Sequence, residues 1–285
     1  MKILVTGKNG QLGKSIHKMI KNQRSDEYIF IGRQELDLSS EKNINHYFNN
    51  NKFDIIINCA AYTQVDKAEE EAELANQINH LAVKQLAGIA RSQQAKLIHL
   101  STDYVFDGKS DKPYVESDIA CPINVYGNSK LAGEKALQEI MPMNAIILRT
   151  SWLYSEYGNN FVKTMLKISA SKKQIRVVND QIGSPTYATD LVRAILKIIK
   201  DKEFRDLDRM TQIYHYSNSG ETSWYEFAKE IFKIAKIDCQ VNPTITLLTP
   251  AVARRPRNTL MSKDKIRSVY RVKTPFWKTS LGSFI

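Results

Sequence analysis

The sequence predicts an α/β fold with a doubly wound parallel sheet and a smaller C-terminal lobe. Short apolar runs alternate with helix-forming stretches, these runs are rich in Ile, Leu and Val, and a glycine-rich turn directly follows the first of them. Continuous apolar strands are typical of a parallel sheet that is buried on both faces. Strands that alternate with helices indicate right-handed βαβ units, and such units build a doubly wound sheet.

The expected elements follow one another in a regular order. The first strand leads into a helix that opens with the glycine-rich turn, the second into a polar helix near 40–50, and the third into a long stretch rich in Ala, Glu and Leu. The fourth strand leads through an irregular loop to the helix of "NVYGNSKLAGEKAL", the fifth to another helical segment, and the sixth to "ATDLVRAILKIIK". The strands are expected at 2–6, 28–32, 54–60, 95–102, 144–150 and 175–179.

Composition narrows the classes of function. The 285 residues are 42% hydrophobic and 25% charged, which is usual for a globular protein. The chain begins with a strand-like run instead of a signal peptide, and Arg193 and Lys197 interrupt its most apolar helical stretch, so we expect a cytoplasmic protein without a membrane span. Cys59, Cys121 and Cys239 lie far apart, which indicates neither a zinc site nor a disulfide framework.

The basic charge does not by itself indicate a nucleic-acid partner. A net charge of +11 could attract nucleic acid or smaller anions such as phosphorylated cofactors. Lys and Arg are spread along the whole chain, however, without a basic tail or a basic stripe interleaved with aromatic residues. We therefore expect no nucleic-acid partner.

The turn "TGKNGQLG" after the first strand indicates a dinucleotide site. Gly7, Gly10 and Gly13 allow a tight turn, a close approach of the backbone to pyrophosphate, and a helix N-terminus that binds anions. An ordinary βα turn is the alternative, but the position between strand and helix favours a Rossmann-type site. Arg33 follows the second strand, where NAD enzymes often carry an acid, so NADPH is favoured over NADH unless Arg33 is only a surface residue.

The chain is expected to divide into two parts. Residues 1–150 form a dinucleotide-binding domain, which continues through about 173–179 and 188–217. The segments 151–172, 180–187 and 218–285 do not continue the alternation of strand and helix. We expect them to form a substrate-binding lobe beside the C-terminal edge of the sheet.

Tyr126 and Lys130 are four residues apart and therefore lie on one face of a helix. An ammonium one turn away from a phenol stabilises the phenolate and lowers the pKa of the phenol, which produces a tuned acid. On its own such spacing more often reflects an exposed helical pair. The glycine turn favours the catalytic interpretation.

A series of motifs extends these observations along nearly the whole chain. In order they are "GKNGQLG", "INCAAYTQVDKAE", "STDYVFDG", "NVYGNSKLAGEKAL", "RTSWLY", "GNNFVKTM" and "DQIGSPTY", followed by "SWYEFAK" and "RRPRNTLMSKDKI". Together they resemble the dTDP-4-dehydrorhamnose reductase family, a group of extended short-chain dehydrogenases. The resemblance implies that NAD(P)H reduces the 4-keto group of dTDP-4-dehydro-L-rhamnose to give dTDP-L-rhamnose for polysaccharide biosynthesis.

The resemblance also implies roles for single residues. Tyr126 corresponds to the general acid, Lys130 to the lysine that tunes it and binds the nicotinamide ribose, and Thr102 to the hydroxyl that hydrogen-bonds the reacting oxygen. Besides Arg33, Tyr126 and Lys130, the expected cofactor contacts are Gly7, Gly10, Gln11, Leu12, Asp37, Leu38, Ala61, Tyr62 and Thr63. The expected substrate contacts are Thr102, Asp103, Arg255 and Trp152, with core packing as the alternative for Trp152.

Two other functions share this fold and many of the motifs. A nucleotide-sugar epimerase or dehydratase often needs further acid or base groups, and "STDYVF" carries no Asp-Glu pair after Thr102, so simple reduction is favoured. A regulatory subunit of the methionine adenosyltransferase type would bind a partner without catalysis, but an intact Thr102, Tyr126 and Lys130 favour an enzyme. We expect a monomer or a homodimer. Some members dimerise through acidic residues and Mg²⁺; no stretch here matches that site, so Mg²⁺ stays open.

Overall fold

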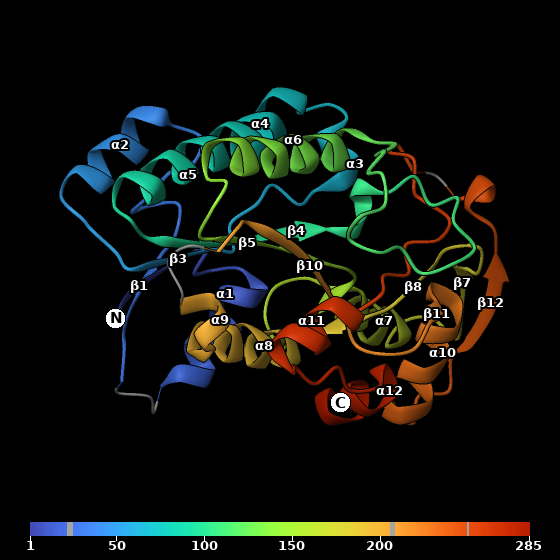
Figure 1. The fold of residues 1–285 in the computed structure, drawn as a ribbon. Coiled ribbons are helices and arrows are strands. Elements are labelled where there is room, and N and C mark those ends of the chain that lie inside the picture. Colours follow the sequence, from blue (N-terminus) through green and yellow to red (C-terminus); the bar gives the residue numbers. More distant parts are fainter. Residues whose placement is uncertain (22–24, 206–208, 250) are drawn as a thin grey trace.

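A six-stranded parallel sheet lies between two helical layers (Figure 1). The computed structural model describes residues 1–21, 25–205, 209–249 and 251–285. The strand order is β10-β5-β4-β3-β1-β2, and every neighbouring pair is parallel. The doubly wound fold is therefore confirmed. The strands are β1 (Lys2–Thr6), β2 (Glu27–Ile31), β3 (Ile55–Asn58), β4 (Lys96–Thr102), β5 (Ala145–Thr150) and β10 (Gln212–Tyr216).

Both faces of the sheet are covered by helices. The upper layer in Figure 1 contains α2 (Glu41–Asn49), α3 (Val65–Ala68), α4 (Ala72–Asn76), the π-helical turn Gln77–Leu81, α5 (Ala82–Ser92) and α6 (Val125–Ile140). The lower layer contains α1 (Gln11–Ile20), α8 (Ala188–Lys200), α9 (Lys202–Arg205) and α11 (Asp264–Tyr270). None of the described helices is long and apolar enough to cross a membrane.

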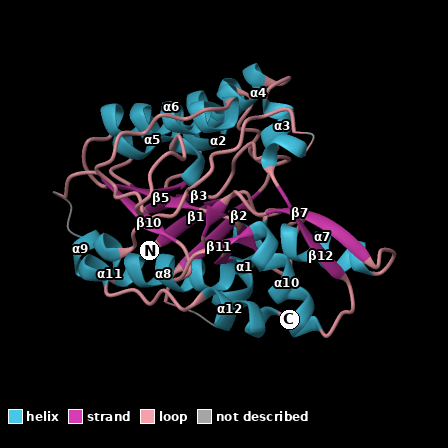
Figure 2. Ribbon diagram, turned by 90° about the vertical axis from the view of Figure 1, so that its right-hand side faces the viewer, coloured by secondary structure: helices cyan, strands magenta, loops and turns pink. Residues whose placement is uncertain are grey.

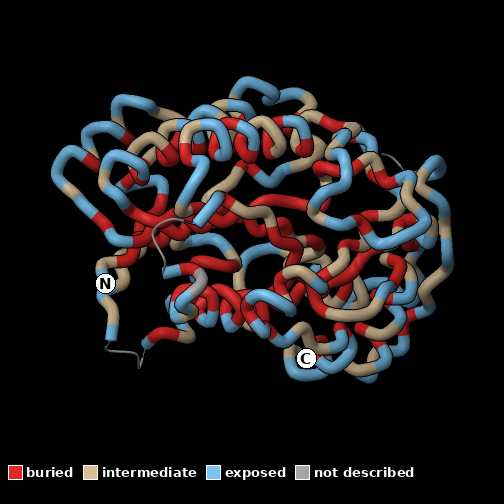
Figure 3. The backbone as a smooth tube through the Cα atoms, viewed as in Figure 1, coloured by how far each residue is buried: buried red, intermediate tan, exposed pale blue. Residues whose placement is uncertain are grey.

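The two cores follow from the alternation of side chains along each strand. Leu4, Ile56 and Leu97 pack upward against α2, α5 and α6. Ile3, Ile57 and Ile98 pack downward against α1 and α8. Figure 3 shows the resulting band of buried residues through the middle of the molecule.

A smaller lobe with its own aromatic core lies beside the sheet. Figure 2 shows the ribbon of β7 and β12 at its outer side. Its core includes Tyr154, Phe227 and Trp277. Its elements are β6 (Leu153–Tyr154), α7 (Phe161–Ser169), β7 (Gln174–Val178), β8 (Ile182–Gly183), β9 (Thr186–Tyr187), β11 (Thr222–Ser223), α10 (Trp224–Ala235), β12 (Gln240–Thr244) and α12 (Trp277–Phe284).

Two segments differ from the expected division. Strand β7 pairs with β12 in the lobe, so the expectation that 173–179 continues the dinucleotide-binding sheet is wrong. Gln174 and Arg176 are exposed, whereas Tyr214, His215 and Tyr216 of β10 are all buried. Because neighbouring side chains point to opposite faces, only β10 suits a strand covered on both faces. Helix α11 packs Ile266 into the lower core although 218–285 was expected in the lobe. The remaining domain boundaries stay a prediction, and residues 206–208 and 250 lie outside the described residues.

Candidate active site

The glycine turn between β1 and α1 forms a cradle that any side chain would fill. Gly7 has a φ of +70°, and a Cβ there would lie 2.9 Å from Ala60 N. A Cβ on Gly13 would lie 2.3 Å from the Gly7 carbonyl oxygen, so α1 packs directly against the turn. Gly10 precedes α1 and has no side chain to cap it. The first N–H groups of the helix are therefore available to phosphate oxygens, and the turn fits a dinucleotide pyrophosphate.

The side chains of Gln11 and Leu12 are occupied by the protein itself. Gln11 Nε2 donates to Leu153 O at 3.2 Å, and its Oε1 accepts from Ser155 and Asn160. Leu12 is buried in the lower core. Any contact of these two expected residues with a cofactor is therefore made by the backbone.

The end of β2 carries charges of both signs. Arg33 is 73% exposed, and its Nε lies 3.6 Å from Asp37 Oδ1. The Gly32 N–H donates to Glu35 Oε2 at 2.9 Å, and the other Glu35 oxygen pairs with Lys8. The absence of an acid directly after the strand was read from the sequence, but Glu35 folds back to that position. No sequence pattern marks this contact, because it depends on the path of the turn.

The backbone after β3 is held by a residue that the sequence analysis missed. The Tyr62 N–H donates to Asn79 Oδ1 at 2.9 Å, and Asn79 Nδ2 donates to Tyr62 O at 3.0 Å. Tyr62 itself is buried, like Leu38 in the upper core, whereas Thr63 is exposed and Ala61 half-buried. Asn79 lies in the π-helical turn Gln77–Leu81, which no pattern in the sequence predicts.

Close packing of α6 brings its first turn to the end of β4. Asn124 caps the helix, since its Oδ1 accepts from the Gly127 N–H at 2.7 Å. A Cβ on Gly127 would lie 2.2 Å from Tyr104 O, and a Cβ on Gly133 would lie 2.1 Å from Asn79 O. The two glycines therefore allow the helix to lie against backbone at both points, and Tyr126 comes beside the end of β4.

Tyr126 and Thr102 meet at the carboxyl end of the sheet. Burial raises the pKa of Tyr126 to about 12, a hydrogen bond with the Thr102 side chain works in the opposite direction, and the nearby Asp103 raises the pKa further. Thr102 Oγ1 donates to Asp103 Oδ1 at 3.1 Å. Asp103 is buried, and burial raises its pKa to about 6 against hydrogen bonds from Thr259 and Thr102. The arrangement places two hydroxyl groups where one carbonyl oxygen could be bound and protonated.

Lys130 lies one turn further along α6 and is almost completely buried. Its Nζ donates to Leu100 O at 2.6 Å and lies 3.2 Å from His99 Nε2. Burial lowers the pKa of Lys130 to about 8, while the charge of Glu134 raises it. The sequence predicts a lowered pKa for Tyr126, but the pKa is raised, because burial and the charge of Asp103 outweigh the hydrogen bond with Thr102. Tyr126 is accordingly protonated at neutral pH, as a proton donor must be.

The expected substrate contacts come from three elements around this point. Trp152 has a φ of +47° and stacks on Trp224 with ring centroids 3.5 Å apart. Arg255 pairs with Asp66 at 2.8 Å. Tyr104 was not expected at the site from the sequence. The centroid of its ring lies 5.9 Å from that of Tyr126, and the charge of Arg255 lowers its pKa against the stronger effect of burial. The motif "STDYVF" carries it, but only the fold shows its place.

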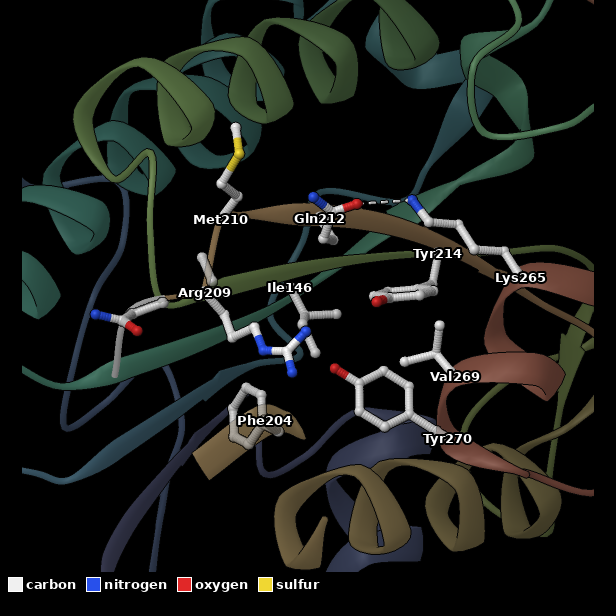
Figure 4. A pocket seen from close by; sticks show the side chains of 11 residues that line it. Ile146, Phe204, Arg209, Met210, Gln212, Tyr214, Lys265, Val269 and Tyr270 are labelled. Carbon is white, nitrogen blue, oxygen red and sulfur yellow. Dashed lines mark hydrogen bonds between the residues drawn. The ribbon is translucent and has the colours of Figure 1, made fainter. Parts of the chain in front are cut away.

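A cavity and the question of a metal site remain, and neither involves Tyr126, Thr102 or Lys130. A cavity of about 460 Å³ opens at the starts of β5 and β10, the end of the sheet opposite Thr102, and includes Phe204, Tyr214 and Tyr270 (Figure 4). It therefore does not belong to the catalytic arrangement. Among the described residues no group of three His, Cys, Asp or Glu side chains could hold a metal ion, so none of them supports the Mg²⁺ that the sequence left open.

Comparison with known proteins agrees with this arrangement. The family described as RmlD substrate binding domain matches residues 1–285. The dTDP-4-dehydrorhamnose reductase of Aggregatibacter actinomycetemcomitans is 37% identical over 98% of this chain and 97% of its own. A crystal structure of a dTDP-4-dehydrorhamnose reductase from Clostridium acetobutylicum has 40% identity and a TM-score of 0.94, covering 100% of this chain and 98% of that one.

A second solved structure adds a cofactor. The dTDP-4-dehydrorhamnose reductase from Bacillus anthracis, in complex with NADP, has 39% identity and a TM-score of 0.93 and covers 99% of this chain and 98% of that one. The match to the RmlD substrate binding domain family and the matches to these relatives extend over essentially the whole chain. This chain therefore belongs to the dTDP-4-dehydrorhamnose reductase family of NAD(P)H-dependent oxidoreductases.

Proposed function

We propose that the chain reduces the 4-keto group of dTDP-4-dehydro-L-rhamnose with Tyr126 as the general acid. The observation that carries this proposal is the meeting of Tyr126 and Thr102 at the carboxyl end of the sheet, one helical turn from Lys130. Ligands of doubly wound folds bind outside the carboxyl ends of the strands. The catalytic groups and the glycine cradle both lie there.

The residues of the chain divide the work of proton transfer. Thr102 and Tyr126 hydrogen-bond the keto oxygen, and bound NAD(P)H supplies the hydride to its carbon. The oxygen then becomes an alkoxide, which is a stronger base than a phenolate, so Tyr126 donates its proton although burial raises its pKa to about 12. Lys130 stabilises the resulting phenolate through its charge.

NADPH is the better hydride donor in this proposal. The Bacillus anthracis relative is a complex with NADP. In the present chain Lys8 and Arg33 flank Gly32 at the end of β2, where the adenosine ribose of a dinucleotide lies in such folds. The carboxylates of Glu35 and Asp37 partly compensate both cations, which makes the preference modest and leaves NADH usable.

Arg255 and Trp152 are proposed as contacts for the nucleotide and the sugar. Asp66 holds Arg255 through Nη2, while Nη1 donates to Ala253 O at 2.9 Å, so the guanidinium has a defined orientation. Burial works against the Asp66 carboxylate, yet hydrogen bonds from Ala253 and Arg255 keep its pKa below the usual value. A guanidinium fixed in this way suits a diphosphate.

The test is a turnover assay with the dTDP-4-keto sugar generated in situ. We expect NADPH or NADH to be consumed in a stoichiometric amount. The absorbance of the reduced cofactor measures this consumption. An epimerase or dehydratase would consume the cofactor only in catalytic amounts, and a regulatory subunit would consume none. Either of those results with folded, cofactor-binding protein would refute the proposed reduction.

A further inference from the structure

Three buried polar side chains cross the upper face of the sheet beside Lys130. Thr6, Asn58 and His99 stand opposite one another in the register of β1, β3 and β4. Each is at most 2% exposed. Two residues earlier on the same strands and the same face, the corresponding positions are Leu4, Ile56 and Leu97 of the apolar core. A polar row at such a place is costly unless every member is hydrogen-bonded, so its presence calls for a function.

The row is connected from end to end. Thr6 Oγ1 donates to Asn58 Oδ1 at 2.7 Å, and Asn58 Nδ2 lies 3.0 Å from His99 Nδ1. On the other side of the ring, His99 Nε2 lies 3.2 Å from Lys130 Nζ. The row therefore links the end of β1, where the glycine turn begins, to the lysine of the catalytic pair.

The charge of Lys130 decides which atoms of the row carry the hydrogen in each hydrogen bond. A neutral imidazole donates through one nitrogen and accepts through the other, whereas an ammonium can only donate. Burial and the charge of Lys130 keep the pKa of His99 well below its ordinary value, so the ring is neutral. When Lys130 is charged, His99 Nε2 must accept from it and Nδ1 must carry the hydrogen. Asn58 then has to present its amide oxygen to Nδ1 and its amide nitrogen to Thr6.

The opposite pattern accompanies a neutral Lys130. The amine then accepts from Nε2–H, Nδ1 accepts from the Asn58 amide nitrogen, and the amide oxygen accepts from the Thr6 hydroxyl. Asn58 and Thr6 have this second orientation in the present structure. The two patterns differ by one proton on Lys130, the tautomer of His99 and a half-turn of the Asn58 amide. Since a hydroxyl both donates and accepts, Thr6 completes the row in either case.

We propose that His99 is a positioning residue for Lys130, and that its tautomer follows the charge of this lysine through the Asn58–Thr6 row. His99 holds one N–H of the ammonium, and the Leu100 carbonyl holds a second at 2.6 Å. The third N–H remains for the reaction. This inference rests on the proposed function only for the role of Lys130 in catalysis, because the row itself exists without a ligand.

The other ionisable groups around Lys130 do not replace His99. Glu134 of α6 is held by Arg149 of β5 at 2.6 Å, and it acts on Lys130 through its charge, which raises the pKa of that lysine. His215 of β10 lies 3.5 Å from Arg149 Nη1. The remaining groups are Tyr126 of α6 and Asp103 and Tyr104 of the turn after β4, and these interact with one another.

Kinetics of matched variants give the first test. His99→Leu removes the acceptor, so the ammonium loses its proton more readily. We expect kcat to fall by about tenfold, less than the roughly 10²–10⁴-fold that general acid catalysis contributes, because the general acid itself is kept. The alkaline limb of the pH profile of kcat should move to lower pH. His99→Gln, whose amide oxygen can accept from Lys130, should restore the limb. His215→Leu removes another buried imidazole of the sheet and should leave the limb in place. An unmoved limb in folded His99→Leu overturns the proposal.

The ¹⁵N chemical shifts of the His99 ring give a second test, which needs no substrate. The signal is assigned in histidine-labelled protein by its loss in His99→Gln. We expect the Nδ1–H tautomer at neutral pH and a change to Nε2–H as Lys130 loses its proton near its pKa of about 8. The change should be absent in Lys130→Met. An Nε2–H tautomer at neutral pH, or the same change in Lys130→Met, contradicts the inference even if the reductase activity is confirmed.

Discussion

Burial sets the acid–base chemistry of single residues at this site. Tyr126 and Asp103 both have raised pKa values, about 12 and about 6, because each charged form would lie in a poorly solvated place. A tyrosine that stays protonated is suited to donate a proton during reduction. The hydroxyl of Tyr126 is therefore the atom whose removal tests the mechanism most directly.

Tyr126→Phe should keep the fold and the cofactor affinity but lose most of kcat. General acid catalysis is worth roughly 10²–10⁴-fold, and the ring without its hydroxyl still fills the same space. Tyr114→Phe removes a hydroxyl bound to Asp107, away from the catalytic residues, and serves as the control. Steady-state kinetics decide: a Tyr126→Phe enzyme within about threefold of wild type would remove Tyr126 from this role.

We expect Asp103 to make the stability of the folded chain depend on pH. Its pKa is raised from 3.8 to about 6 in the folded chain. Its contribution to the free energy of unfolding is therefore complete below pH 3.8 and is lost as the pH rises through about 6. At 1.36 kcal/mol per pKa unit the loss is at most roughly 3 kcal/mol. Asp103→Asn should abolish this loss of stability, whereas Asp111→Asn, at an exposed position, should leave it in place. Denaturant titrations at pH 4 and pH 7 that give the same change for wild type and Asp103→Asn would contradict this.

We expect Arg33 to have a small effect on the preference for NADPH over NADH. We expect wild type to favour NADPH and Arg33→Ala to reduce the ratio of kcat/KM values for NADPH and NADH by up to about fivefold, since exposed ion pairs are worth at most about 1 kcal/mol. The NADH value should stay nearly unchanged. Arg91→Ala, on α5, is the control. If wild type prefers NADH, or the ratio does not move, Arg33 is only a surface residue.

At the scale of elements, the position of α6 depends on two close approaches to backbone. Gly127 lies against Tyr104 O and Gly133 against Asn79 O, where a Cβ would lie within 2.2 Å of each oxygen. The glycines of "YGNSKLAGE" therefore serve the packing of the helix that carries the proposed catalytic residues. The same helix orients Tyr126 and Lys130, so a shift of the helix is felt directly at the site.

Gly127→Ala should destabilise the protein and slow the reaction together. Backbone has to move to accommodate the methyl group, which typically costs about 1–3 kcal/mol, and Tyr126 moves with it. Gly88→Ala in α5 is the matched control, because a Cβ there meets nothing within 4 Å. That change should be neutral or stabilising by up to about 1 kcal/mol. Equal melting temperatures for the two variants would show that α6 tolerates the side chain.

At the scale of the whole molecule, the glycine turn and the smaller lobe are joined through Gln11. Its side chain contacts Leu153, Ser155 and Asn160, which begin the lobe. One side chain therefore holds the start of the lobe against the glycine turn. This link was not expected, since Gln11 was assigned to the cofactor.

Gln11→Ala should raise KM for the cofactor more than it changes kcat. The variant loses three hydrogen bonds that hold the lobe against the turn, each worth about 0.5–1.5 kcal/mol net, while the catalytic pair on α6 is untouched. Gln85→Ala, which removes a glutamine with hydrogen bonds on the surface, is the control. A fall in kcat at unchanged KM would show that the lobe is not positioned through this residue.

The sequence by itself determined the fold class and the family, and it predicted that Tyr126 and Lys130 lie on one face of a helix. Strand–helix alternation depends on local periodicity, and the spacing of Tyr126 and Lys130 depends only on helical geometry, so both are readable along the chain. Five of the six expected strands belong to the central sheet for the same reason.

Only the tertiary structure decided which partners these residues have. β10 replaced 175–179 as the sixth strand because burial on both faces depends on the layers around it. The contact of Glu35 with Gly32 depends on the path of one turn. Asn79 on Tyr62 and His99 beneath Lys130 are contacts between separate segments, whose distance in space no local pattern encodes. The pKa values of Tyr126 and Lys130 follow from burial, and burial is a property of the assembled layers.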